Sequence, residues 1–189
     1  LLDNIFKRGT TGTSLQVSGL VVSSPKPEQK TELVANQIKV LGDVDGSKYP
    51  ISKGRLPLEH LRKYPNLRMR SKKISSVQRI RNCCAKTTHD FFQNHGFTYV
   101  QTPIITGNDC EGAGEVFGLD KDLSEKMFGK QVSLTVSGQL HGETYACGMG
   151  DIYTFGPTFR AEDSHTSRHL SEFWMIEPEL CFINLNQLM

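Results

Sequence analysis

The sequence predicts an α+β fold in which a short β unit precedes a larger unit with an antiparallel sheet and helices. Two segments rich in valine and leucine lie near the N-terminus and are separated by a proline-containing loop. A long segment with helical spacing of apolar residues follows, and two β-rich segments joined by a polar loop lie near the C-terminus. Strands joined by a polar loop, with no helix between them, favour an antiparallel hairpin over a doubly wound parallel sheet.

The first unit is predicted from two strand-like segments, residues 14–24 and 31–42, in which apolar and polar side chains partly alternate. The intervening SPKPEQK contains two prolines, which favour a turn. Two strands are too few for a closed barrel. We therefore interpret residues 1–45 as the back part of a small β domain, whose first strands precede the sequence given.

Positive charge is concentrated in the N-terminal part of the chain. Residues 1–73 carry 14 Lys and Arg against 6 Asp and Glu (+8), residues 74–189 carry 8 against 14 (−6), and 8 minus 6 gives the +2 of the whole chain. Residues 46–73, rich in proline and basic side chains, predict a basic linker between two domains. This distribution fits a polyanionic partner on the N-terminal side, and it equally fits an ordinary solvated basic face.

The longest predicted helix spans residues 75–95. Ser75 or Ser76 is its predicted N-cap, and Gly96 is its predicted stop. Its apolar side chains recur at spacings of three and four residues, which is typical of an amphipathic helix: Val77, Ile80, Cys84, Phe91 and Phe92.

The rest of the second unit alternates between strand and helix signals. FTYVQTPIIT predicts a strand that Pro103 ends or bends, and CEGAGEVFG predicts a flexible loop. QVSLTVS predicts a strand that leads into a helix over GQLHGETYACGM. DIYTFGPTFRAE and EFWMIEPELCFI predict the two long strands of a hairpin, joined by the polar loop DSHTSRHLS.

The composition excludes several classes of protein and of site. No apolar run approaches the roughly 18 residues of a membrane span, and LLDNIFKRGTTG lacks the zones of a signal peptide, so we expect a cytoplasmic protein. The five cysteines form neither a CxxC metal frame nor an even disulfide set, which favours reduced structural thiols and no metal centre. No GxxxxGK[ST] loop is present, and no Ser-His-Asp or Cys-His set suggests a covalent nucleophile.

The segment TFRAEDSHTSRHLSEFWMIEPE concentrates charged and aromatic side chains. Alternation along its two strands, together with the loop between them, is expected to bring six side chains to one surface: Arg160, Glu162, Arg168, His169, Phe173 and Glu177. Arginine suits phosphate oxygens and an aromatic face suits a nucleobase, so this set fits a nucleoside triphosphate lying on the sheet. The residues alone also allow a surface hairpin with ordinary cross-strand charge pairs and a core phenylalanine.

FRAE, a loop and RHLSEFWMIEPE together resemble motif 2 of the class II aminoacyl-tRNA synthetases, in the aspartyl, asparaginyl and lysyl subgroup. HGFTYVQTPIIT resembles motif 1, whose role in the family is dimer contact, and CEGAGEVF and LTVSGQLHGE resemble the amino-acid loop and pocket. The upstream GLVVSSPKPEQKTELVANQIKVLG and LPLEHLRKYPNLRMRS resemble the end of an OB-fold and its linker.

This resemblance covers nearly the whole chain. It implies part of an OB-fold β-barrel, the anticodon-binding domain, over residues 1–45 and a basic linker over residues 46–73. Residues 74–189 would form the N-terminal part of a catalytic domain, with the antiparallel sheet core and helices of the class II synthetases.

The resemblance also implies a role for each hairpin residue. Arg160 would bind the α-phosphate of ATP and stabilise the charge that develops as a carboxylate attacks phosphorus. Glu162 would contact the adenylate or the terminal adenosine of tRNA. Arg168 and His169 would hold the outer phosphates, and Phe173 would stack on adenine. Mg2+ is expected with the triphosphate, since such chemistry usually needs a charge-neutralising divalent ion.

In the amino-acid pocket the resemblance implies that Glu111 receives the substrate ammonium, in a loop that its glycines make mobile. Ser137, Gln139 and Glu177 would line the same pocket. The alternative is an acidic surface loop with no ligand.

The element SGQLHGE bears on the choice between aspartate and asparagine. Aspartyl enzymes carry a lysine here, in a pattern resembling SPQLFK, and its ammonium pairs with the side-chain carboxylate of the substrate. The corresponding position is Gly142, followed by Glu143. A carboxylate accepts a hydrogen bond from an amide and repels another carboxylate, so Glu143 agrees with asparagine unless it is merely an exposed helical side chain.

The resemblance therefore implies an asparagine–tRNA ligase that uses asparagine, ATP and tRNA(Asn), forms a homodimer and has no membrane partner. The third motif of the family is absent, so we expect the sequence to be part of a longer enzyme. Three alternatives stay open: an aspartyl-tRNA synthetase, the related asparagine synthetase without an OB-fold, and a non-catalytic RNA-binding fragment. SGQLHGE counts against the first and the N-terminal β unit counts against the second.

Overall fold

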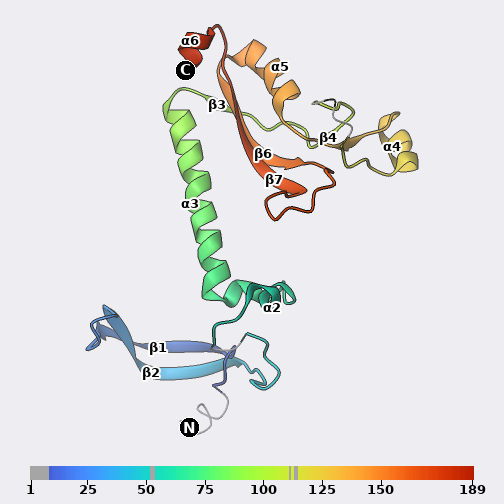
Figure 1. Ribbon diagram of the computed structural model, residues 1–189. Coiled ribbons are helices and arrows are strands. Elements are labelled where there is room, and N and C mark those ends of the chain that lie inside the picture. The colour runs from blue at the N-terminus through green and yellow to red at the C-terminus, as the bar shows by residue number, and fades with distance from the viewer. Residues whose placement is uncertain (1–8, 52–53, 111, 113–114) are drawn as a thin grey trace. The chain divides into compact units, whose positions relative to one another are not determined.

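The computed structural model describes residues 9–51, 54–110, 112 and 115–189. The chain divides into two compact units, Leu1–Arg81 and Asn82–Met189. Strands and helices occur in both units, and most of the elements are labelled in Figure 1. The mixed α+β class predicted from the sequence is confirmed.

The first unit contains a long antiparallel hairpin, β1 (Ser14–Ser23) with β2 (Thr31–Gly42). The pairing shifts register between Ser18 and Gly19. A Cβ at Gly19 would come within 2.0 Å of the Val34 carbonyl oxygen, so only glycine allows the two backbones to approach this closely. Among the described residues these strands form a two-stranded sheet, and several of their apolar side chains are exposed.

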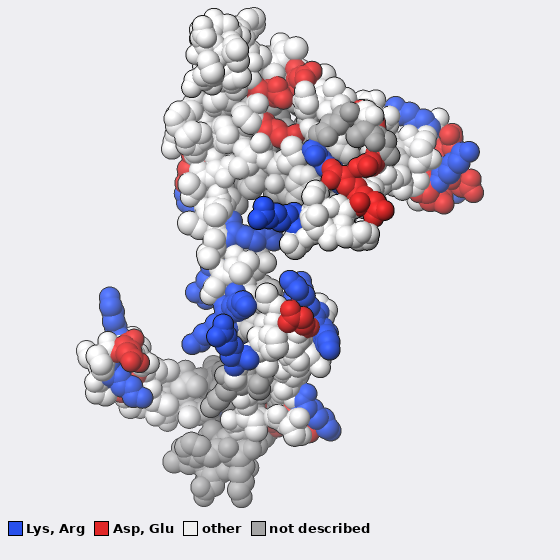
Figure 2. Space-filling model, viewed as in Figure 1, with Lys and Arg blue, Asp and Glu red and all other residues white. Residues whose placement is uncertain are grey.

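The predicted linker contains the short helix α2 (Leu58–Arg62) and the 3-10 helix η1 (Arg68–Arg70). Leu61 is buried, and the Arg70 guanidinium donates to the Tyr49 hydroxyl at 3.0 Å and lies 5.8 Å from the centre of its ring. Lys and Arg gather over α2 and the start of the next helix, as Figure 2 shows. Proline and basic residues therefore do not prevent this segment from packing.

The long helix α3 spans Lys72–Asn94. The N-cap predicted at Ser75 or Ser76 is wrong: the helix begins earlier, and Ser71 Oγ accepts the Ile74 N–H at 3.4 Å. The stop predicted at Gly96 is confirmed, because Gly96 adopts φ +87°, which L side chains rarely adopt.

The C-terminal half of α3 belongs to the second unit and packs against its β6 strand. His89 Nδ1 lies 2.6 Å from the Tyr153 hydroxyl, to which Gln93 also donates at 3.3 Å. Phe92 stacks on the Tyr153 ring with their centres 4.6 Å apart, and Tyr153 is completely buried. Val77, Ile80 and Phe91, which the helical pattern assigned to an apolar face, remain exposed.

The main sheet of the second unit joins β6 (Ile152–Phe159) and β7 (Glu172–Glu179) as an antiparallel hairpin, with β3 (Thr98–Tyr99) on the other side of β6. The predicted hairpin is confirmed. The prediction omitted one feature: β3 pairs parallel to β6, so the sheet is mixed. β3 and β6 are separated in the sequence by two helices, which gives the chain room for a parallel crossover.

Pro103 interrupts the predicted strand over residues 97–106. β3 ends before it, and β4 (Ile105–Thr106) follows it and pairs antiparallel with β5 (Ser133–Leu134). Between them, α4 (Lys121–Phe128) starts at Asp120, which accepts the Leu123 N–H, and ends at Gly129.

Helix α5 (Gln139–Met149) lies along β6 and β7 (Figure 1). Val100, Ala146 and Ile152 form the buried core between these elements, with Cys181 packed against it. This packing holds the N-terminus of α5 close to the β6–β7 hairpin. A short helix, α6 (Leu185–Leu188), follows β7.

Candidate active site

The predicted cluster lies at the loop end of the β6–β7 hairpin. Arg160 and Glu162 follow the last residue of β6, so the prediction that the strand itself delivers both side chains is wrong. Instead, the Arg160 N–H donates to the Ser171 carbonyl at 3.1 Å and extends the pairing by one residue, after which the chain turns away. The two side chains still meet, with Arg160 Nη1 3.9 Å from Glu162 Oε1.

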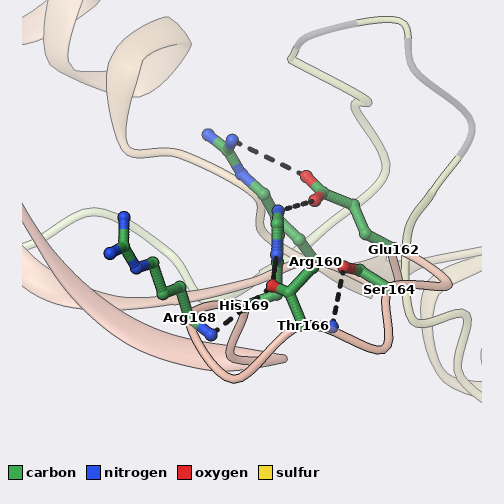
Figure 3. Close-up of polar contacts among 6 residues, drawn as sticks. All are labelled: Arg160, Glu162, Ser164, Thr166, Arg168 and His169. Atoms are coloured by element: carbon green, nitrogen blue, oxygen red, sulfur yellow. Dashed lines mark hydrogen bonds and ion pairs between the residues drawn. The ribbon is translucent and has the colours of Figure 1, made fainter.

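Glu162 also faces His169, whose Nε2 lies 3.8 Å from Glu162 Oε2 (Figure 3). The other ring nitrogen of His169 is hydrogen-bonded to the Thr166 hydroxyl, which fixes the orientation of the ring. The Arg168 guanidinium points away from this group in Figure 3, and the residue is held by its backbone N–H, which donates to Thr166 Oγ1 at 3.4 Å. Arg160, Glu162 and His169 are thus brought together, whereas the Arg168 side chain lies apart.

Phe173 enters the cluster from β7. The centre of the Arg160 guanidinium lies 5.5 Å from the centre of the Phe173 ring, within the range of a cation–π contact. Phe173 is half-buried, and Thr158 on β6 pairs with it. An arginine, an aromatic face and a carboxylate therefore share one surface, on which the arginine suits phosphate oxygens and the aromatic face suits a nucleobase.

A second cluster lies where α5 begins. The Ser137 hydroxyl and the Gly138 N–H both donate to the Glu177 carboxylate, the latter at 3.0 Å from Oε2. Gln139 Nε2 donates to Glu143 Oε1 at 3.0 Å, one turn along the helix. Ser137 is buried, Glu177 is half-buried, and Gln139 and Glu143 are exposed. The structure thus brings Ser137 together with Glu177, and Gln139 with Glu143.

Glu143, Glu177 and Glu179 form an acidic group beside α5. Burial raises the pKa of Glu179 above its ordinary value, and the negative charges of Glu143 and Glu177 raise it further. Such a group favours an incoming donor such as an amide or an ammonium and disfavours a second carboxylate.

Replacing Glu179 by glutamine should therefore stabilise the protein at neutral and alkaline pH. The raised pKa means that wild-type Glu179 favours folding only while it is protonated, and that this contribution is lost as pH rises through the folded-state pKa. We expect Glu179→Gln to have a higher Tm than wild type at pH 8, and the difference to disappear as pH falls below the ordinary value of 4.5. Thermal unfolding of both proteins across this pH range measures the difference in Tm. A difference that does not change with pH would contradict the prediction.

The predicted amino-acid loop is only partly described. Glu111 lies outside the described residues, as does Gly114. At the far end of the loop the Glu115 carbonyl accepts the Ala161 N–H at 2.8 Å, which ties the loop to the segment that follows β6. Cys110, at its near end, has Sγ 3.9 Å from Gln139 Oε1.

Sequence reasoning missed Thr154 and Gly138. Thr154 lies opposite Glu177 on the neighbouring strand and donates its hydroxyl hydrogen to Glu177 Oε2 at 3.0 Å. The hairpin register that pairs them could have been found only by fixing the length of the intervening loop, for which the sequence offers no turn motif. Among the described residues no group of three or more His, Cys, Asp or Glu could hold a metal ion. No described helix is both long and apolar enough to span a membrane.

Comparison with known proteins places these two clusters in a family. The family described as tRNA synthetases class II (D, K and N) matches residues 58–189. The chain belongs to this family. The matched residues include α3, the β6–β7 hairpin and α5, and so contain both clusters of the candidate active site of this class II synthetase chain.

Individual relatives agree with the family. The asparagine–tRNA ligase of Treponema denticola is 49% identical over 214 aligned positions, covering 100% of this chain and 45% of the relative. That of Pseudoalteromonas translucida is 50% identical over 194 positions, covering 95% of this chain and 42% of the relative. The chain therefore spans less than half the length of the relatives that it matches.

Solved structures match the fold over almost the whole chain. The asparaginyl-tRNA synthetase of Pyrococcus horikoshii complexed with asparaginyl-adenylate is 26% identical, with a TM-score of 0.83, covering 98% of this chain and 42% of that one. The asparaginyl-tRNA synthetase of Entamoeba histolytica is 25% identical, with a TM-score of 0.81 and the same coverage.

Proposed function

We propose that the complete protein is an asparagine–tRNA ligase, which activates asparagine with ATP to an aminoacyl-adenylate and transfers it to tRNA(Asn). One observation carries this proposal. An arginine, an aromatic ring and a carboxylate converge at the loop end of the β6–β7 hairpin, and the same unit holds, beside α5, an acidic group that suits an amide substrate. Relatives named asparagine–tRNA ligases, 47% to 50% identical to the chain, support the same reaction.

In this proposal Arg160 binds the α-phosphate of ATP and stabilises the charge that develops as the asparagine carboxylate attacks phosphorus. Its contacts with Glu162 and Phe173 favour that role, because they hold the guanidinium in place before the substrate arrives. Phe173 stacks on adenine, and Glu162 contacts the adenylate or the terminal adenosine of tRNA. The reaction needs no covalent protein nucleophile, since positioning and electrostatic stabilisation suffice.

The outer phosphates are assigned to Arg168 and His169. His169 faces the cluster, whereas the Arg168 guanidinium would have to swing toward it on a long, flexible side chain (Figure 3). Mg2+ would neutralise charge on the triphosphate. Because the described residues offer no three-ligand group, we assign no metal ligand in this part of the chain.

The substrate asparagine lies, in this proposal, beside the start of α5, where Ser137, Gln139, Glu143 and Glu177 line its pocket. Glu111, outside the described residues, would receive the ammonium group. Two observations favour asparagine over aspartate: no lysine occupies position 142, and three carboxylates surround that part of α5. A substrate carboxylate would be repelled there, whereas an amide NH2 would be accepted.

The partners follow from the same proposal. We assign residues 1–45 to part of the OB-fold that binds the anticodon and residues 46–73 to the linker; the basic surface over α2 favours tRNA as the partner (Figure 2). A homodimer through α3 would cover the exposed Val77, Ile80 and Phe91, and light scattering that found an active monomer would contradict it. Charging of tRNA for translation favours a cytoplasmic location.

ATP–pyrophosphate exchange by the complete protein, with asparagine and aspartate in parallel, tests the function. We expect asparagine-dependent exchange and little exchange with aspartate. Strong exchange with aspartate would instead favour an aspartyl enzyme. Absence of exchange with either amino acid would favour a non-catalytic RNA-binding protein.

A further inference from the structure

Three protein groups donate hydrogen bonds to the Glu177 carboxylate. Its Oε1 accepts from the Ser137 hydroxyl, its Oε2 accepts from the Thr154 hydroxyl at 3.0 Å, and the Gly138 N–H is shared between Oε2 at 3.0 Å and Oε1 at 3.3 Å. A carboxylate offers about four lone-pair positions, and these protein donors occupy most of them. Hydrogen bonds from the protein therefore decide the direction in which Glu177 can accept one more donor.

Thr154 contributes the contact that comes from outside the turn. Ser137 and Gly138 are neighbours in the segment that starts α5, whereas Thr154 lies in the middle of β6, directly opposite Glu177 in the hairpin register. Thr154 is only 4% exposed, so bulk water cannot replace Glu177 as the hydrogen-bond partner of its hydroxyl. A hydrogen bond to an ionised group in such surroundings is among the stronger ones in proteins.

The Ser137–Gly138 turn packs closely against Thr154, because position 138 is a glycine. A Cβ added at Gly138 would lie 3.0 Å from Thr154 Oγ1 and 3.0 Å from Thr102 Oγ1, closer than side chains normally approach. Glycine at position 138 thus lets the turn reach both Glu177 and Thr154. A cavity of about 250 Å³ borders these groups, so the carboxylate of Glu177 adjoins open space and not solid packing.

We propose that Thr154 is a positioning residue for amino-acid recognition: it fixes the Glu177 carboxylate, and through it the Ser137–Gly138 turn from which Gln139 and Glu143 emerge. This inference rests on the proposed function and adds to it a residue that does not touch the substrate. The nearest member of the ATP cluster, Phe173, pairs with Thr158, four residues further along β6 and about 13 Å away for an extended strand. Loss of the Thr154 hydroxyl should therefore lower kcat/KM for asparagine and leave KM for ATP nearly unchanged.

The test uses Thr154→Val in the complete enzyme, because valine keeps the shape of threonine and removes only the hydroxyl. We expect kcat/KM for asparagine in ATP–pyrophosphate exchange to fall by about tenfold to a hundredfold, the scale for a lost hydrogen bond to a charged group. KM for ATP should change less than about twofold. Thr154→Ser, which restores the hydroxyl, should recover most of the activity.

Thr158→Val is the matched control. Thr158 is also a buried threonine on the same face of β6, but its hydroxyl donates to the Phe173 carbonyl at 3.3 Å and not to Glu177. We expect its KM for asparagine to stay at the wild-type value. If Thr158→Val and Thr154→Val raise the KM for asparagine equally, Thr154 acts only through general stability and the inference is overturned.

Gly138→Ala provides a second route to the same result, because its methyl group would crowd the Thr154 and Thr102 hydroxyls, each 3.0 Å away, and so disturb the contact between Thr154 and Glu177. Gly138→Ala should lower kcat/KM for asparagine as Thr154→Val does, while the affinity for ATP is retained. Wild-type kinetics in both Thr154→Val and Gly138→Ala, in an enzyme that activates asparagine, would overturn the inference. A wild-type protein without asparagine-dependent exchange would instead reject the proposed function, so the two failures are distinguishable.

Discussion

Arg160→Ala should reduce asparagine-dependent exchange by the complete enzyme by about a hundredfold to a thousandfold. A preorganised donor aimed at developing charge contributes about 2.7 to 4 kcal/mol to transition-state stabilisation. Arg160 meets that description, because Glu162 and Phe173 hold its guanidinium and its backbone N–H is tied to Ser171. The loss should appear in kcat more than in KM for ATP, since the interaction strengthens as charge develops.

Two further variants make this result specific. Arg160→Lys keeps the charge but loses the planar fork, so it should recover only part of the rate. Arg168→Ala removes an arginine whose guanidinium points away from the cluster, so its effect should be smaller and mainly on KM for ATP (Figure 3). Near-normal exchange in Arg160→Ala, with an unchanged Tm, would remove Arg160 from the site.

Much of the fold could be predicted because its signals are local. The helical spacing before Gly96 and the two strands around a polar loop are each contained within a short stretch of sequence, and both are confirmed. The N-cap of α3 was placed four or five residues too late, at Ser75 or Ser76, because Ser71, Ser75 and Ser76 are all good N-cap types. The parallel pairing of β3 with β6 depends on residues far apart in sequence, which no local pattern reports.

The candidate site was predicted less completely, for a related reason. Residue types identified Arg160, Glu162, His169 and Phe173 as a set, and the structure brings them together. Thr154 was missed, since a threonine in a strand is ordinary until the hairpin register places it opposite Glu177. The pocket role of Glu143 remains a prediction: the residue is exposed on α5, yet close enough to raise the pKa of Glu179.

Gly142→Lys should produce the largest change in substrate preference. Gly142 is buried on the face of α5 that meets the sheet, and a Cβ added there would lie 3.5 Å from Glu179 Cγ and 3.6 Å from Ile152 Cδ1, which is ordinary contact. A lysine at this position would bring its ammonium among the carboxylates of Glu143, Glu177 and Glu179. It would compete for the acceptors that an asparagine amide needs and would attract the carboxylate of aspartate.

Two unit charges about 4 Å apart at an effective dielectric near 20 interact by roughly 4 kcal/mol, which corresponds to about a thousandfold. We therefore expect the asparagine-to-aspartate ratio of kcat/KM in steady-state exchange to fall by up to about that factor. Gly142→Met is the matched control, because methionine has a similar length without the charge. It should lower kcat/KM for asparagine and for aspartate by the same factor. If the lysine and methionine variants show the same ratio, charge at position 142 does not set the preference, and discrimination must come from other residues.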